Sequence, residues 1–116
     1  MAAELRLICD SEQLEEGGVG VRFDVSFGGG ETPAFAVRFD GLCRAYLNQC
    51  AHIPVELDFQ EGEFFDDSGL YLVCSTHGAL YAPESGACMG GPCNGRGLTP
   101  LKVVEMDGQV FVKEED

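Results

Sequence analysis

Glycine interrupts this sequence so often that no long regular helix can be drawn through it. Sixteen of the 116 residues are glycine, and they gather at 17–20, 28–30 and 86–97. The segments between them are short, and none shows the 3.6-residue apolar period of an amphipathic helix. Short strands joined by turns are therefore the predicted structure.

Seven segments alternate apolar and polar residues or are rich in β-branched and aromatic ones, which is typical of strands. In VRFDVSF (21–27), alternate apolar side chains share one face, as in a sheet with one side in water. Asp107-Gly108 suits a two-residue hairpin turn, because both positions need positive φ. Ser11 is a candidate N-cap for one short helical turn ending at Gly17. The predicted strands are 5–9, 21–27, 34–39, 43–48, 70–74, 101–106 and 109–113.

The predicted fold class is all-β, with antiparallel strands in a single domain, since the chain is long enough for one modest core. Two stretches, 49–69 and 75–100, carry no strand pattern and are predicted to be long loops. Loops of this length in a compact domain are usually functional or are anchored by something.

The charge excludes one class of partner. Seven basic and twenty acidic side chains give a formal net charge of -13, so nucleic acid is not expected to bind. The acidic surface indicates a protein partner with a basic patch, or it serves only to keep the protein in solution.

The sequence has no apolar run long enough to span a membrane, and its start lacks the basic region of a signal peptide. No membrane partner and a cytoplasmic location are therefore expected. In that compartment the six cysteines are expected to bind metal, act in redox chemistry or be buried.

Two Cys/His pairs stand at the ends of predicted strands. The first pair, Cys50-x-His52, comes just after the predicted strand 43–48. The second pair, Cys74-x-x-His77, begins at the last residue of the predicted strand 70–74. Together the two pairs contain both histidines of the chain. Thiolate and imidazole donors suit iron-sulfur centres, zinc and copper. A single pair would be a weak signal, but two on neighbouring loops can enclose a metal from both sides.

These pairs resemble the ligand pattern of Rieske [2Fe-2S] proteins, and YLNQCAH, THGALY and GPC around them agree with it. The resemblance extends over about 44–112 and implies a single Rieske-type antiparallel β-sheet domain over 1–116. Within it, a cluster-binding subdomain at approximately 45–97 would be formed by the two loops. One [2Fe-2S] cluster per chain would be held by Cys50 and Cys74 on the inner iron and His52 and His77 on the outer one.

The resemblance also implies the redox chemistry. Two neutral imidazoles replace two anionic thiolates, so Rieske potentials lie at about -150 to +300 mV, against about -400 mV for plant-type ferredoxins. Reduction should raise the pKa values of the two histidines, so the potential is expected to fall as pH rises.

Residues around the four ligands refine this expectation. The quinol-oxidising branch joins its two ligand loops by a disulfide, but Val55 and Thr76 stand at those positions here. A serine that donates to the cluster in that branch is Ala79, which predicts a potential in the lower part of the range. Tyr81 is retained and would donate to a cysteine sulfur, or it is an ordinary core aromatic.

The other residues implied near the cluster are Gly78 and Pro92. By resemblance, the Gly90-Gly91-Pro92 segment packs over the cluster as a lid stiffened by the proline, although an ordinary turn suits the two glycines equally.

The remaining cysteines divide into two pairs. Cys9 and Cys43 lie on predicted strands and are expected to be small buried residues. Cys88 and Cys93 flank MGGP and could form a local disulfide, supply a further metal ligand or pack as thiols. Packed thiols are the expectation in a reducing compartment.

The function expected from the resemblance is one-electron transfer without catalysis, because no substrate site is evident. A Rieske ferredoxin would take electrons from a flavin reductase and pass them to an oxygenase or another redox enzyme. The alternative is a small electron-transfer or docking subunit like that of assimilatory nitrite reductase. A Cys2His2 zinc module fits less well, since Cys50-x-His52 has one intervening residue where structural zinc pairs have about two to four or more. A thiol oxidoreductase using Cys88 and Cys93 lacks the C-x-x-C device.

Overall fold

The computed structural model describes residues 4–27, 30–49, 57, 62–74, 78–91 and 97–114. These residues form antiparallel strands and one short 3-10 helix, η1, so the predicted all-β class is confirmed. The elements are β1 (Glu4–Asp10), η1 (Ser11–Gln13), β2 (Val21–Phe27), β3 (Gly30–Phe39), β4 (Leu42–Leu47), β5 (Leu72–Val73), β6 (Leu80–Tyr81), β7 (Cys88–Gly90), β8 (Pro100–Leu101), β9 (Val103–Met106) and β10 (Gln109–Glu114).

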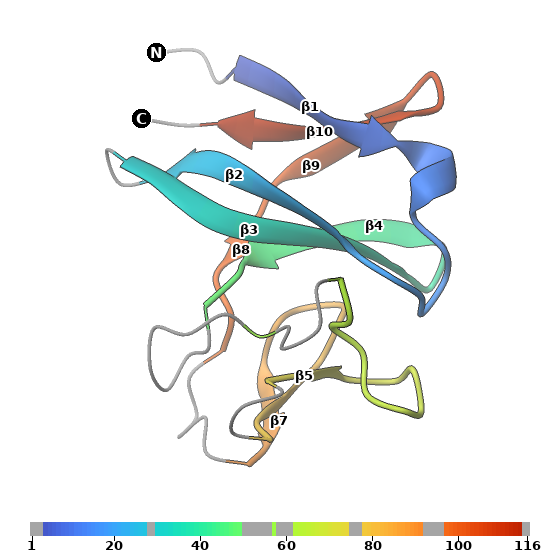
Figure 1. Cartoon of the computed structure of the whole chain (residues 1–116), viewed down its shortest axis with the longest axis vertical. Helices are drawn as coiled ribbons and strands as arrows, with labels where there is room; N and C mark the ends of the chain where they lie inside the picture. The colour runs from blue at the N-terminus through green and yellow to red at the C-terminus, as the bar shows by residue number, and fades with distance from the viewer. Residues whose placement is uncertain are drawn as a thin grey trace.

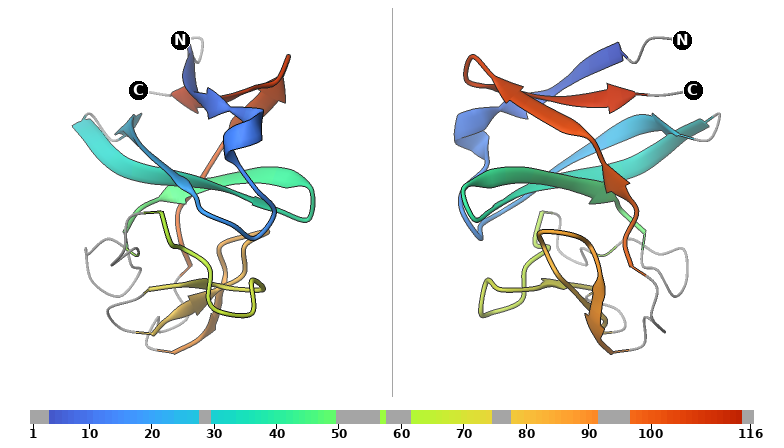
Figure 2. Two further views of the ribbon diagram at one scale, coloured as in Figure 1. Left: turned by 45° about the vertical axis from the view of Figure 1, so that its right-hand side comes forward. Right: turned by 180° about the vertical axis from the view of Figure 1, so that it is seen from behind.

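The strands build three sheets. Their strand orders are β1-β10-β9, β2-β3-β4-β8 and β5-β6-β7. The first two sheets lie against each other in the upper part of Figure 1, and the small third sheet lies beneath the four-stranded one. Both views of Figure 2 show the same layering. The four-stranded sheet therefore has an apolar layer on each of its faces.

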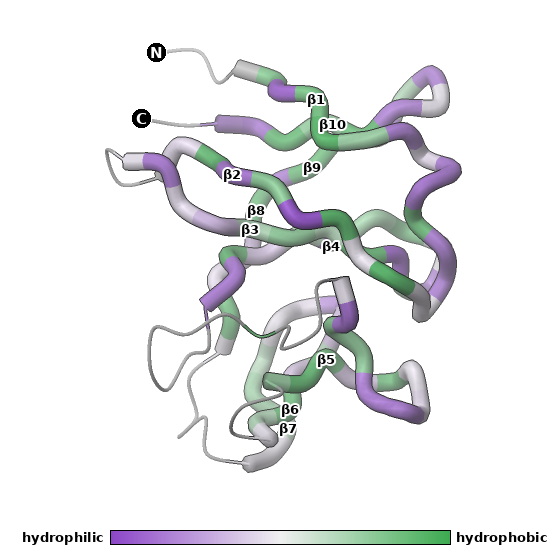
Figure 3. The backbone as a smooth tube through the Cα atoms, in the orientation of Figure 1, coloured by the Kyte–Doolittle hydropathy of each residue, from purple (hydrophilic) through white to green (hydrophobic). Residues whose placement is uncertain are grey.

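Side chains from both faces of this middle sheet fill the core. Ala36 and Ala45 pack with Val110 of β10 on the upper side. On the lower side Phe35 stacks on Phe64, with ring centroids 3.9 Å apart. Along the backbone in Figure 3, the apolar colour is concentrated in the strands, and the turn that precedes β5 is hydrophilic. The two cores tie the third sheet to the upper pair.

The structure confirms two local predictions, one in β2 and one in the turn between β9 and β10. In β2, Val25 is buried while Arg22 and Asp24 are exposed, as the alternation predicts. The Asp107-Gly108 turn joins β9 to β10 with φ of 52° and 74°, so both central residues adopt the positive φ that the hairpin needs.

The predicted helical turn is capped by Asp10 in place of Ser11, and it ends earlier than the sequence predicted. It is the 3-10 helix η1, and the residue before it is Asp10, whose N–H donates to Gln13 Oε1 at 2.9 Å. The turn ends at Leu14 and not at Gly17. The Gln13 side chain caps the start of the turn, and the turn ends because the Leu14 backbone is extended, with φ of -105° and ψ of 106°.

The prediction that 75–100 is one long loop is wrong, because it contains β6 and β7. These strands have two and three residues, too short for a period-2 pattern to be read. The predicted strand 101–106 is also divided: β8 pairs with β4, whereas β9 pairs with β10. This short stretch thereby links the two upper sheets.

Arg38 fastens the same two sheets through hydrogen bonds. It lies on β3, where its Nε–H donates to Leu14 O at 2.9 Å and its Nη2 donates to Glu105 Oε2 of β9 at 2.8 Å. The pKa of Glu105 is lowered, chiefly by the hydrogen bond from Arg38. The guanidinium is mostly shielded from water, so this pair is less screened than an exposed one.

We expect Arg38→Met to lower the free energy of unfolding by about 2–3 kcal/mol near neutral pH, because it removes charge-assisted hydrogen bonds. A carboxyl whose pKa is lowered on folding stabilises the fold above its unfolded pKa, and that stabilisation is lost as pH falls through the folded pKa. The deficit of the variant should therefore be smaller at about pH 3 than at about pH 7. Urea unfolding at both pH values measures this, and an equal deficit at both would contradict the Glu105 contribution.

Within the described ranges, no helix has the length and apolar character that a membrane crossing requires.

Candidate metal centre

The second predicted ligand loop is closed by backbone hydrogen bonds. Cys74 follows β5, is not disulfide-bonded and has none of its surface exposed. Its N–H donates to Ala79 O at 2.9 Å, and its carbonyl accepts the N–H of Gly78 at 2.7 Å. Gly78 has φ of 74°, which favours glycine. The base of the loop is therefore fixed on both sides, with one predicted ligand at its start.

The first predicted ligand loop is closed by a side chain. Asn48 follows β4, and its N–H donates to Pro33 O at 2.9 Å. The Asn48 side-chain carbonyl accepts the N–H of Leu57 at 2.9 Å, in a buried contact. Asn48 and Leu57 thus hold the two ends of the segment that contains Cys50 and His52 in sequence.

The bases of the two loops meet in one core. Leu57, Cys74, Ala79 and Tyr81 are fully buried and belong to the same apolar cluster beneath the four-stranded sheet. The structure therefore brings the end of the first loop and the start of the second together, as an enclosed metal centre requires.

The structure describes part of the predicted site. Cys74, Gly78 and Tyr81 lie within it, whereas Cys50, His52, His77 and Pro92 lie outside the described residues. Among the described side chains no group of three or more His, Cys, Asp or Glu is placed to hold a metal. Three of the four predicted ligands are not in that set, so the full ligand assignment stays a prediction.

Two buried tyrosines support the region. Tyr81 of β6 shares the core with Cys74, and its predicted bond to a cysteine sulfur stays a prediction. Tyr46 of β4 was not predicted as part of the site. Its hydroxyl donates to Pro83 O at 2.5 Å, and burial raises the pKa of Tyr46 to about 12. Tyr46 thereby connects the middle sheet to the turn between β6 and β7. The sequence signal that could have pointed to Tyr46 is its position in the strand that leads into Cys50.

Gly91 packs directly on the second ligand loop. It has φ of 79°, and a Cβ there would lie 2.7 Å from Gly78 O and 2.8 Å from the Cα of Ala79. No side chain fits at that distance, so Gly91 is more than an ordinary turn residue. A Cβ at Gly90 would meet nothing within 4 Å. The lid interpretation thus gains a contact at Gly91, while Pro92 lies outside the described residues.

The expectation of packed thiols at 88 and 93 is wrong for Cys88, which is disulfide-bonded. The other described cysteines, Cys9, Cys43 and Cys74, are not disulfide-bonded. The expectation rested on the redox compartment, which says nothing about whether a backbone brings two thiols together.

The expectation that the other two cysteines are buried is confirmed for Cys9 and only in part for Cys43. Cys9 is buried and Cys43 is partly buried in the upper core. Burial raises the pKa of Cys43 to about 12, so this thiol stays protonated and is a poor metal ligand.

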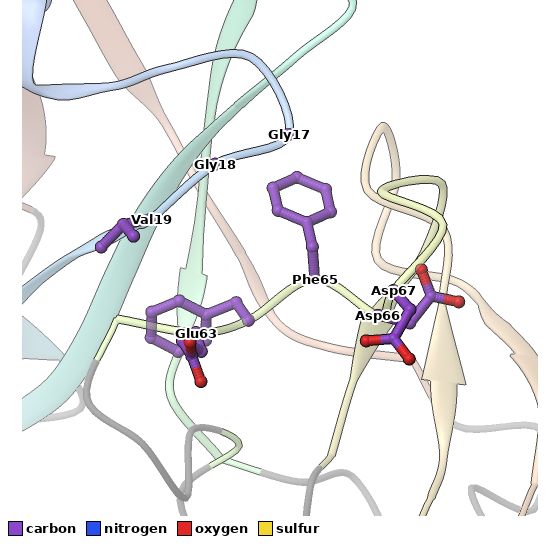
Figure 4. A pocket seen from close by; sticks show the side chains of 8 residues that line it. Gly17, Gly18, Val19, Glu63, Phe65, Asp66 and Asp67 are labelled. Carbon is purple, nitrogen blue, oxygen red and sulfur yellow. The ribbon is translucent and has the colours of Figure 1, made fainter.

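A separate acidic hollow of about 270 Å³ lies between residues 17–19 and 63–67. Figure 4 shows the Phe65 side chain pointing toward Gly17 and Gly18, with the Asp66 and Asp67 carboxylates to one side. Burial acts to raise the pKa of Asp66, but hydrogen bonds from Ser68 and from backbone N–H groups lower it overall. The carboxylate is therefore anionic and already bonded within its own turn.

Sequence comparison decides the family. The chain matches the Rieske [2Fe-2S] domain over residues 4–112. It belongs to the Rieske family. No curated protein matches it significantly.

Solved Rieske structures share the fold. The ferredoxin of carbazole 1,9a-dioxygenase from Nocardioides aromaticivorans IC177 is 24% identical, with a TM-score of 0.75 over 96% of this chain and 98% of that one. The Sphingomonas yanoikuyae B1 ferredoxin is 20% identical, with a TM-score of 0.75 over 97% and 100%. A chain of the reduced complex between oxygenase and ferredoxin in carbazole 1,9a-dioxygenase is 20% identical to this chain, with a TM-score of 0.73. The match covers 97% of this chain and 29% of that one.

The described residues fit the Rieske cofactor, a [2Fe-2S] cluster. Cys74 offers a fully buried sulfur at the base of a closed loop, which suits a thiolate ligand shielded from water. The end of the first loop lies in the same core, and Gly91 covers the base of the second. The fold therefore brings the described bases of the two loops together in one core, as a cofactor held between two loops needs.

Proposed function

We propose that this Rieske protein holds one [2Fe-2S] cluster on Cys50, His52, Cys74 and His77, and transfers single electrons between redox proteins. The observation that carries the proposal is the fully buried Cys74, which lies in the same core as Leu57, the returning end of the first loop. When bound, the cluster supplies a one-electron acceptor whose potential is set by its ligands and their hydrogen bonds.

The chain's own residues would supply enclosure and orientation. The backbone bonds at Cys74 and Gly78 fix the approach of the second pair, while Leu57 and Tyr81 exclude water beneath it. Exclusion of water and hydrogen bonding to cluster sulfurs are the protein's means of setting a potential. Ala79, fully buried, has no hydroxyl to donate, which supports a potential in the lower part of the Rieske range.

The proposed partners are a reductase as donor and an oxygenase or another redox enzyme as acceptor. Support comes from the similarity to a chain named as the ferredoxin of a dioxygenase, which this chain covers almost completely. The net charge of -13 favours basic docking surfaces on both partners. We propose a carrier without a substrate reaction of its own, working in the cytoplasm.

An anaerobic reductive titration tests the carrier function. The purified holoprotein is titrated with dithionite while its visible absorption and its potential are recorded against redox dyes. One electron per chain, with a midpoint between about -150 and +300 mV, is the expected result. Uptake of two electrons, or a midpoint near -400 mV, would contradict a Rieske carrier.

The disulfide at Cys88 should stabilise the fold without holding the cluster. Cys88→Ala removes a cross-link from the unfolded chain, so we expect the free energy of unfolding to fall by about 2–4 kcal/mol. The cluster absorption should remain at the level of the unmodified protein, which visible spectroscopy and iron analysis measure. Loss of iron from a folded Cys88→Ala variant would instead make this cysteine part of the metal centre.

A further inference from the structure

Apart from the tyrosines, Asn48 is the only residue with a polar side chain that is buried among the described residues, with 1% of its surface exposed. It stands directly after β4, at the point where the middle sheet gives way to the first ligand loop. An amide in an apolar core is unfavourable unless hydrogen bonds compensate for the lost water. A buried asparagine at this position therefore indicates a bond that an apolar residue of similar size could not make.

That bond closes the loop. The Asn48 backbone N–H is tied to Pro33 O, which continues the pairing of β4 with β3. Its side-chain Oδ1 accepts from Leu57 N–H at 2.9 Å, nine residues further along the chain. One residue thus belongs to the rigid sheet through its backbone and holds the returning end of the loop through its side chain.

The two ligand loops differ in this respect. The described hydrogen bonds at the base of the second loop join backbone groups, from Cys74 N–H to Ala79 O and from Gly78 N–H to Cys74 O. No substitution other than proline removes those backbone groups. Among the described contacts, the bond that closes the first loop depends on the chemical identity of residue 48, because the acceptor is a side-chain oxygen.

We infer that Asn48 is a positioning residue for the cluster: its side-chain carbonyl fixes the base of the loop that carries Cys50 and His52. The inference rests on the proposed function for the identity of those ligands. Fixing a loop at both ends reduces the conformations from which its ligands can leave the metal, so the bond slows loss of the cluster and fixes the geometry at its iron.

The test compares Asn48→Leu with Val112→Ala. The first removes the acceptor while keeping the number and branching of the side-chain heavy atoms, and the second weakens the core at β10, in the β1-β10-β9 sheet. Cluster loss is followed by visible absorption with an iron chelator, well below the unfolding temperature. Asn48→Leu should lose the cluster about tenfold faster, since a buried N–H is left without its acceptor, while Val112→Ala stays within about twofold of the unmodified protein. The EPR g-values of reduced Asn48→Leu should also shift, which a loss of stability alone would not cause.

Unchanged cluster lifetime and g-values in folded Asn48→Leu would overturn the inference, and so would equal acceleration in both variants. If Asn48→Leu does not fold, hydrogen exchange at the Leu57 amide of the unmodified protein decides. Slow exchange supports the bond, whereas exchange as fast as in an unfolded chain overturns it. Absence of an iron-sulfur spectrum from the unmodified protein would count against the proposed function, and Leu57 exchange would still test the Asn48 bond in that sample.

Discussion

Cys74→Ser is expected to abolish the visible absorption of the cluster. The thiol of Cys74 is fully buried at the start of the closed second loop, where it would be a thiolate ligand when iron is bound. A serine hydroxyl does not ionise near neutral pH and is a poor ligand for iron-sulfur centres. Iron and sulfide analysis of the variant, purified without oxygen, should give values near zero where the unmodified protein has two of each per chain.

Cys43→Ser is the matched control. Cys43 is also a free cysteine, but it lies partly buried in the upper core with its pKa raised to about 12. The same thiol-to-hydroxyl change there should leave iron and sulfide content unchanged. A folded Cys74→Ser variant that retained a full cluster would remove Cys74 from the ligand set, whatever the control showed.

Gly91→Ala is the substitution expected to destabilise the fold most among the glycine changes considered. A non-glycine residue at φ of 79° costs about 1–2 kcal/mol, and forcing a methyl group into packed surroundings costs a further 1–3 kcal/mol or so. Its Cβ would meet the backbone of Gly78 and Ala79, which cannot rotate away as a flexible side chain can. We expect a total of about 3 kcal/mol or more in denaturant unfolding, with faster loss of the cluster.

Gly108→Ala separates the two contributions. Gly108 has a similar φ of 74°, but a Cβ there would meet nothing within 4 Å. Its cost should be the conformational part alone, about 1–2 kcal/mol. Equal destabilisation by the two variants would mean that Gly91 does not pack on the ligand loop as closely as the structure has it.

Local chemistry explains which parts of the fold could be predicted from the sequence. The alternation in 21–27 and the Asp107-Gly108 pair are short-range signals, and the structure confirms both. Strands β6 and β7 were missed because two or three residues carry no period, and they form only where the neighbouring strand supplies a partner. The upper sheets could therefore be anticipated, whereas most of the small sheet that supports the metal centre could not.

The candidate site shows the same division. Residue type and spacing were enough to predict Cys74 as a ligand, and the family resemblance pointed to Tyr81; both lie in one buried core. The parts that depend on tertiary contacts were not anticipated: Asn48 bonding to Leu57, and Tyr46 bonding to Pro83. The Cys88 disulfide was not predicted, because a reducing compartment was expected and the sequence does not show which cysteines the backbone brings together. Such contacts join residues whose separation in sequence carries no periodic signal.

The proposal that the two Cys/His pairs hold a Rieske cluster is tested most directly by spectroscopy of the purified protein. The visible absorption and low-temperature EPR spectra of protein purified without oxygen are recorded before and after dithionite. A red-brown protein whose reduced form gives a rhombic signal, with average g clearly below that of all-cysteine [2Fe-2S] clusters, is the predicted result. A colourless, EPR-silent protein that contains stoichiometric zinc would contradict it.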